Sequence, residues 1–134
     1  MTALNKAVVL RIPVGAIVIA GDLTSPAGAS PIVGRVTDVR YTATTLITGT
    51  ALPNSRHLTL FNRGQGGAGV AVAGGPLALG VGTDCAANVA RPIGVGATPA
   101  VAVGDVFDWD STHDGTGLVD PGGMVEIEIT PGLA

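Results

Sequence analysis

The chain has 134 residues, the length of a single domain. Glycine and proline supply 30 of them (21 plus 9), while lysine, glutamate and glutamine number only four in all. So few straight-chain polar residues cannot cover amphipathic surface helices, and the composition predicts an all-β protein of short strands and tight turns. Seven basic against ten acidic residues, with four aromatic residues, exclude the basic and aromatic surface of a nucleic-acid-binding protein.

The first predicted elements are two β-branched strands within residues 7–20, AVVLRI and AIVIA, separated by a Pro-Val-Gly turn. Arg11 and Pro13 interrupt this apolar stretch, so it is too short for the apolar region of a signal peptide. Nowhere does the chain reach the ~20 apolar residues of a membrane-spanning helix. Residues 21–31 are rich in turn-forming residues and predict a loop.

The remainder of the chain also reads as strands joined by turns. Strands are predicted within residues 33–50, 56–62, 70–72, 77–81, 90–95, 101–110 and 124–130. Residues 124–130 alternate apolar with polar side chains, which indicates one face on a core and one face in water. We expect a single-domain antiparallel β-sandwich, jelly-roll-like, over residues 35–134. Residues 1–34 are expected to form N-terminal strands and an arm that packs on a neighbour.

Charge is divided unevenly along the chain. Residues 1–91 hold all seven bases and three acids, whereas residues 92–134 hold seven acids and no base. This division would let the basic part of one copy meet the acidic part of another, or it reflects two groups of strands that are solvated separately.

Residues 64–69 (GQGGAG) match the dinucleotide-binding pattern GxGxxG. That chemistry needs a helix directly after the glycines, because the free N–H groups of a helix start bind the pyrophosphate. Residues 70–76 (VAVAGGP) will not form a helix, and no Walker-type lysine is present. The pattern therefore predicts a flexible hairpin loop.

Five aspartates lie close together in the sequence: Asp105, Asp108, Asp110, Asp114 and Asp120. Asp108 and Asp110 flank Trp109 in a predicted strand, with Cβ atoms ~6.6 Å apart, which overlaps the ~6.5–9.5 Å between the carboxylates of inverting glycosidases. Trp109, the natural platform for a sugar ring, points to the opposite face, which argues against catalysis. Calcium suits the loop better, although neither Asp108 nor Asp110 starts an EF-hand pattern.

Other reactive residues give no catalytic arrangement. Ser111, His113 and Asp114 lie in one turn, where they cannot form a chain of nucleophile, base and orienting acid, and no G-x-S-x-G motif exists. His57 is expected at a sheet surface or interface, and Cys85 as a small packed residue with no neighbour that lowers its pKa. We assign no catalytic, cofactor-binding or metal-ligating residue and expect no enzyme.

Residues 103–130 (VGDVFDWDSTHDGTGLVDPGGMVEIEIT) resemble a segment of tailed-bacteriophage virion proteins. In those small β proteins a GD-hydrophobic-x-W/F-x-S strand leads into a GTGLxDPGG loop and a final VEVxx strand. The matching residues are Gly104, Asp105, Trp109, Ser111, Gly115, Thr116, Gly117, Leu118, Asp120, Pro121, Gly122, Gly123, Val125 and Glu126. Residues 55–69 (SRHLTLFNRGQGGAG) are also similar, as a strand that runs into a glycine-rich loop.

The two similar segments cover 43 of 134 residues (28 plus 15), and the first third of the chain is unmatched. The resemblance implies a capsid decoration protein, or a related head or fibre component, with a jelly-roll-like sandwich that is often trimeric. No functional residues transfer, because such proteins act through surfaces.

We therefore expect a structural virion protein on the capsid surface, which binds the outside of a phage head as a homotrimer and stabilises the shell by bridging subunits of the major capsid protein. The N-terminal strands are the candidate capsid-facing part, because open strand edges can add strands from another chain. The alternative is a glycan- or receptor-binding β-sandwich of a phage fibre or tail, with calcium in the loop over residues 108–120. Neither interpretation involves a cofactor, nucleic acid or a membrane.

Overall fold

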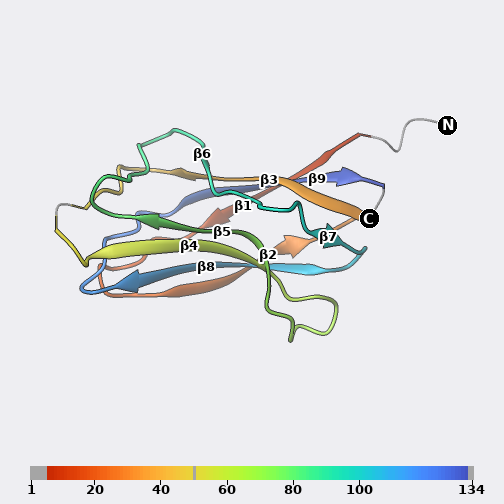
Figure 1. Cartoon of the computed structure of the whole chain (residues 1–134), viewed down its shortest axis with the longest axis horizontal. Helices are drawn as coiled ribbons and strands as arrows, with labels where there is room; N and C mark the ends of the chain where they lie inside the picture. The colour runs from red at the N-terminus through yellow and green to blue at the C-terminus, as the bar shows by residue number, and fades with distance from the viewer. Residues whose placement is uncertain (1–5, 50, 133–134) are drawn as a thin grey trace.

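A computed structural model of the chain describes residues 6–49 and 51–132. These residues form two antiparallel sheets that pack face to face, and the elongated body of the sandwich is seen in Figure 1. The predicted all-β class and the single β-sandwich are confirmed. Within the described ranges there is no helix long and apolar enough to cross a membrane.

The first sheet has the strand order β1-β9-β3-β6, and β7 also pairs with β3. Its strands are β1 (Val8–Val14), β3 (Gly34–Ala43), β6 (Arg91–Pro92), β7 (Ala100–Val101) and β9 (Gly123–Pro131). The alternation predicted for the last strand is confirmed in β9, where the apolar residues Val125, Ile127 and Ile129 are fully buried.

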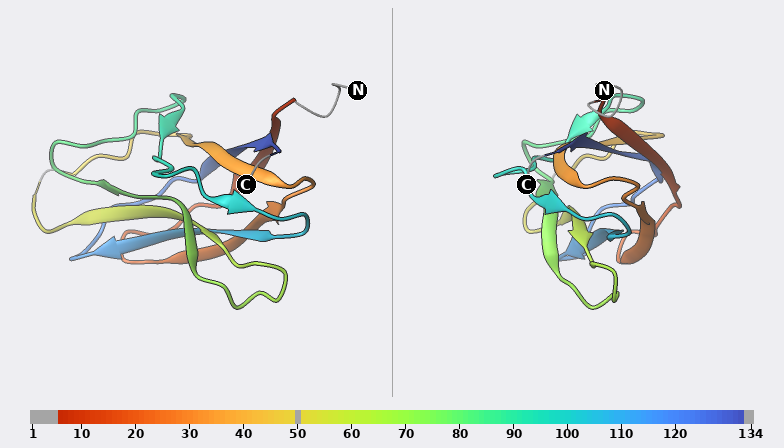
Figure 2. Two further views of the ribbon diagram at one scale, coloured as in Figure 1. Left: turned by 45° about the vertical axis from the view of Figure 1, so that its right-hand side comes forward. Right: turned by 90° about the vertical axis from the view of Figure 1, so that its right-hand side faces the viewer.

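The second sheet has the order β2-β8-β4-β5. Its strands are β2 (Leu23–Ala29), β4 (Ser55–Asn62), β5 (Ala71–Leu79) and β8 (Val106–Asp114). β4 and β5 form a hairpin through the glycine-rich residues 63–70, which project from one end of the sandwich in Figure 2. The GxGxxG match is thus a hairpin loop, as predicted.

The core lies between the two sheets. Trp109 of β8 and Tyr41 of β3 meet there with ring centroids 5.3 Å apart, and both residues are fully buried. Phe107 of β8 and Cys85 are also fully buried, so Cys85 is the small packed residue that the sequence predicted. Since Trp109 fills the core, it offers no surface to a sugar ring.

The N-terminal strands belong to the sandwich itself. β1 pairs with β9 over seven residues, and β2 pairs with β8. The predicted boundary at residue 34 therefore falls between β2 and β3, and strands on both sides of it belong to the same two sheets. Residues 1–5 of the expected arm lie outside the described residues.

Two predictions about residues 16–31 were wrong. Residues 23–29, expected as a loop, form β2, because β8 supplies a complete strand partner and a bulge between Pro26 and Ala29 absorbs the turn-forming residues. The expected strand AIVIA (16–20) is a turn instead, in which the amide of Gly21 donates to the carbonyl of Val18 (2.9 Å). The chain crosses from one sheet to the other here, and its backbone pairing is limited to an isolated bridge between Ile17 and Asp120.

Candidate binding surface at the loop end of the sandwich

Four connections gather at one end of the sandwich, opposite the end where β1 begins (Figure 1). β1, β3, β5 and β8 run toward this end, and β2, β4 and β9 start from it. We call this end the loop tip. Its described residues are 15–22, 44–49, 51–54, 80–90 and 115–122.

The loop tip is apolar. Of the twelve exposed large apolar side chains among the described residues, seven belong to it: Val18, Ile19, Leu46, Leu52, Val81, Val89 and Val119. Leu52 and Val18 are the most exposed, at 79% and 74%. The loops of the tip contain no lysine, arginine or glutamate. An apolar surface depleted in lysine and glutamate has the composition of the buried part of a protein interface.

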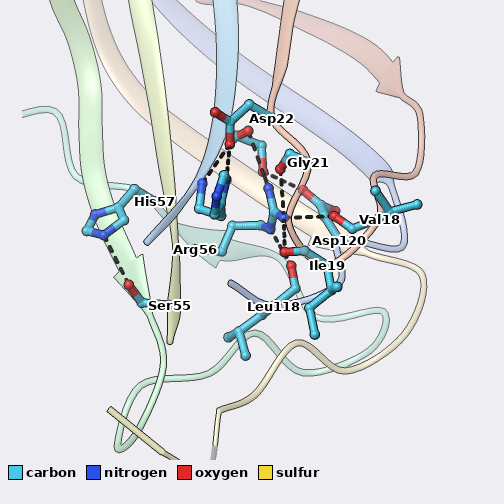
Figure 3. Close-up of polar contacts among 11 residues, drawn as sticks. Val18, Ile19, Gly21, Asp22, Ser55, Arg56, His57, Leu118 and Asp120 are labelled. Carbon is cyan, nitrogen blue, oxygen red and sulfur yellow. Dashed lines mark hydrogen bonds and ion pairs between the residues drawn. The ribbon is translucent and has the colours of Figure 1, made fainter. Parts of the chain in front are cut away.

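Arg56, at the start of β4, holds the loop tip from the inside (Figure 3). Its Nε donates to the carbonyl of Leu118 (2.7 Å), and its Nη2 donates to the carbonyls of Gly21 (3.0 Å), Val18 and Ile19 (3.3 Å each). The residue is fully buried, and this burial lowers the pKa of the guanidinium from its usual value. One planar side chain thus fixes two of the four loops.

A buried carboxylate, Asp120, completes the polar network under the tip. Its Oδ1 accepts from the hydroxyl of Tyr41 (2.7 Å) and the amide of Gly122 (3.0 Å), and its Oδ2 accepts from the hydroxyl of Ser111 (2.7 Å). Arg56 Nη1 donates to the same Ser111 hydroxyl (3.2 Å), so this hydroxyl joins the buried cation to the buried anion. Burial and the bond to Asp120 raise the pKa of Tyr41 above its usual value. Such satisfied networks rigidify the loops they hold.

The five aspartates singled out in the sequence do not form one cluster. Asp120 faces the core, and Asp114 is exposed at the end of β8. Asp105 lies at the opposite end of the sandwich, where it accepts from Asn62 Nδ2 (3.0 Å) and the amide of Ala102 (2.9 Å). Within residues 6–49 and 51–132, no group of three or more His, Cys, Asp or Glu side chains is placed to hold a metal ion. The aspartates that the calcium hypothesis brings together therefore lie at separate places in the fold.

Asp108 and Asp110 do share a face, the outer face of the second sheet, but they share it with Arg63. Arg63 Nε donates to Asp108 Oδ2 (2.8 Å), and its Nη2 lies 3.9 Å from Asp110 Oδ2. The guanidinium also lies over the ring of Phe61, 4.9 Å from its centroid. Because the guanidinium contacts both carboxylates, the arrangement is an ion pair and lacks the open gap of a glycosidase site.

The residues of the suspected triad also separate. Ser111 is buried under the tip, and His113 pairs through Nδ1 with Asp22 (2.6 Å). His57 contacts Ser55 through Nε2 (3.1 Å), a pair that sequence reasoning missed. No carboxylate of the described residues bonds to His57, so this pair lacks the orienting acid of a triad.

The chain is thus a β-sandwich with an apolar loop end, two loops of which are held by buried hydrogen bonds. Comparison of the sequence and the structure with family models, curated proteins and solved structures gave no match.

Proposed function

We propose that the chain is a structural virion protein, a capsid decoration protein that docks on the outer surface of a phage head through its loop tip and stabilises the shell. The observation that carries this proposal is the loop tip itself, whose seven exposed apolar side chains find no partner surface within the described chain. The partner is the major capsid protein, and the working form on the capsid surface is a homotrimer.

The rigidity of the loop tip favours binding. Arg56 and Asp120 fix two of its four loops, residues 15–22 and 115–122, through buried hydrogen bonds, so little conformational entropy is lost when a partner covers these two loops. Three such tips in one trimer raise the effective affinity of contacts that are individually modest.

The order of the strands supports the jelly-roll interpretation. β1 to β4 fall alternately in the first and second sheets, and β8 and β9 return to lie between β2 and β4 and between β1 and β3. This wrapped order is what two Greek keys produce, and jelly rolls are common in viral capsid proteins.

The open edge of β1 supports the proposal less than the loop tip does. β1 is an outer strand of the first sheet, so a partner strand has room to pair with it. Pro13, however, has no N–H to donate, and Arg11 is already engaged with Glu126 (3.0 Å).

Co-sedimentation with phage heads that lack this chain tests the proposal. Val119→Asp places a charge in the tip, whereas Val103→Asp places the same charge at the opposite end, and the two valines are equally exposed (56% and 53%). We expect Val119→Asp to weaken binding roughly tenfold or more, because a buried unpaired charge is costly, and Val103→Asp to bind normally. A wild-type chain that stays in the supernatant, or equal binding of the two variants, contradicts the proposal. Binding to glycans that a chelator abolishes would support the alternative.

A further inference from the structure

The outer edge of the second sheet is unusually bare. β5 is the last strand of that sheet and pairs only with β4 among the described residues. Exposed edges are normally protected by charged side chains, especially lysine, because their free backbone groups attract other strands. Residues 64–83, which contain all of β5, include no charged residue. The edge therefore lacks charged protection, and Pro76 is the residue that interrupts it.

Apolar side chains and an apolar groove accompany this edge. Val70 is 69% exposed and Val72 is 46% exposed. Beside them lies a groove of about 250 Å³ between β5 and the turn that precedes β7. Only apolar side chains and glycines line it: Val72, Gly74, Gly75, Val95, Gly96, Ala97 and Pro99.

The unpaired edge of β5 is interrupted at Gly75 and Pro76. The amide of Gly75 donates to the carbonyl of Gly94 (2.7 Å), and Pro76 follows with no N–H of its own. These two residues divide the edge of β5, and the part beside Val70 and the groove is residues 71–73.

We propose that this edge is a self-association surface at which a second copy of the chain docks. Each copy carries a net charge of −3, so copies repel each other wherever acids meet with no base between them. At the β5 edge no charge opposes the approach. The inference rests on the proposed function only in that both require more than one copy.

The edge is also self-complementary in shape. An exposed valine and an apolar groove lie next to each other, so in a head-to-tail contact Val70 of one copy covers the groove of the next, and three such contacts close a ring. The remaining edges suit self-association less well. β1 carries the charged Arg11, and β2, which like β5 contains a proline and a bulge, has no exposed large apolar side chain.

Light scattering after size exclusion, over a concentration series, tests the inference. The wild type is expected at three times 13.2 kDa, and Val72→Lys and Val70→Lys are each expected as monomers with unchanged Trp109 emission. Val103→Lys, with a valine of similar exposure at another place, should keep the wild-type mass. Val70 lies outside the strand, so its variant tests the surface without altering the sheet.

A wild type that is monomeric at the highest concentration overturns the inference. The inference is also overturned if the single variants Val72→Lys and Val70→Lys both keep the oligomer mass of the wild type. The result is separable from the test of the loop tip. Val119→Asp should keep the oligomer mass of the wild type but no longer bind phage heads. Val72→Lys should have the mass of a monomer and bind phage heads more weakly, since only multivalency is lost.

Discussion

At the scale of single residues, Asp110 is a partly buried carboxylate with incomplete hydrogen bonding. Its Oδ1 is buried with no hydrogen-bond partner, and its Oδ2 lies 3.9 Å from Nη2 of Arg63, which bonds Asp108 more closely. Burial raises the pKa of Asp110 above its usual value, and the nearby charge of Asp108 raises it further, while Arg63 and Thr24 offset part of this effect. The charged form of Asp110 thus lowers the free energy of unfolding.

Asp110→Asn should therefore stabilise the protein at neutral pH. Because the folded pKa lies above the unfolded one, the folded state binds this proton more tightly, and stability is lost as the pH rises through the interval between the two values. At pH 7 the penalty is fully present, and the variant should gain roughly 0.5–2 kcal/mol in the free energy of unfolding. Urea denaturation at pH 7 and near pH 3 measures this gain, which should vanish at the acidic pH.

Asp108→Asn is the matched control, since it removes the carboxylate that Arg63 actually bonds. It should destabilise the protein at pH 7. If Asp110→Asn were the destabilising variant instead, the carboxylate of Asp110 would be better satisfied than its surroundings indicate.

The sequence contained part of the information needed to find Arg56. Leu58 and Leu60 are two residues apart and so share one face of a strand, and the same alternation carried back two residues puts Arg56 on that face, which is buried. What no alternation can show is which carbonyls such a side chain meets. The partners Leu118 and Gly21 are 62 and 35 residues away in the chain, and only the packing of the sheets brings them together.

At the scale of elements, β9 organises the first sheet because β1 and β3 both pair with it. Gly123 begins this strand between Val14 and Ala43. A Cβ at Gly123 would run into the backbone carbonyl of Thr42, which cannot move without opening the pairing of β3 with β9. Glycine is required here by close approach, and its φ is not in the left-handed region.

Gly123→Ala should accordingly destabilise the protein by roughly 1–3 kcal/mol, the usual consequence of forcing an extra carbon into a packed site. Gly66→Ala is the control, since a Cβ there has no atom within 4 Å, and its effect should stay within about 0.5 kcal/mol. Midpoints of urea denaturation compare the two. Equal midpoints would mean that β3 and β9 separate at this point without loss.

Elements with their own periodicity were predicted well, and elements defined by a partner were not. β9 and β4 alternate clearly in sequence and lie where they were expected. β2 carries Pro26, Gly28 and small residues, so only its pairing with β8 makes it a strand. The same dependence on tertiary contacts explains why the apolar residues 16–20 form a turn.

At the scale of the whole molecule, the two oppositely charged parts of the sequence meet within one copy. Arg11 in β1 pairs with Glu126 in β9, and Arg63 after β4 pairs with Asp108 in β8. These basic and acidic residues therefore pair within one copy of the chain. Arg11 is 63% exposed, so its pair contributes at most about 1 kcal/mol, and the arrangement is a consequence of strand order and does not drive it.

That strand order places β1 and β2 beside the last two strands of the chain. Without them β9 loses β1, β8 loses β2, and the core loses Leu10, Ile12 and Val14, which pack against it. We expect a chain that starts at residue 35 to lack cooperative unfolding and to show the red-shifted emission of a solvated Trp109, whereas the full chain unfolds cooperatively with Trp109 buried. Tryptophan fluorescence during urea denaturation distinguishes the two states, and addition of residues 6–34 as a peptide should restore the buried emission. A cooperative transition of the shortened chain alone would instead establish residues 35–134 as a self-sufficient domain, and β1 and β2 as strands that the sandwich can lose.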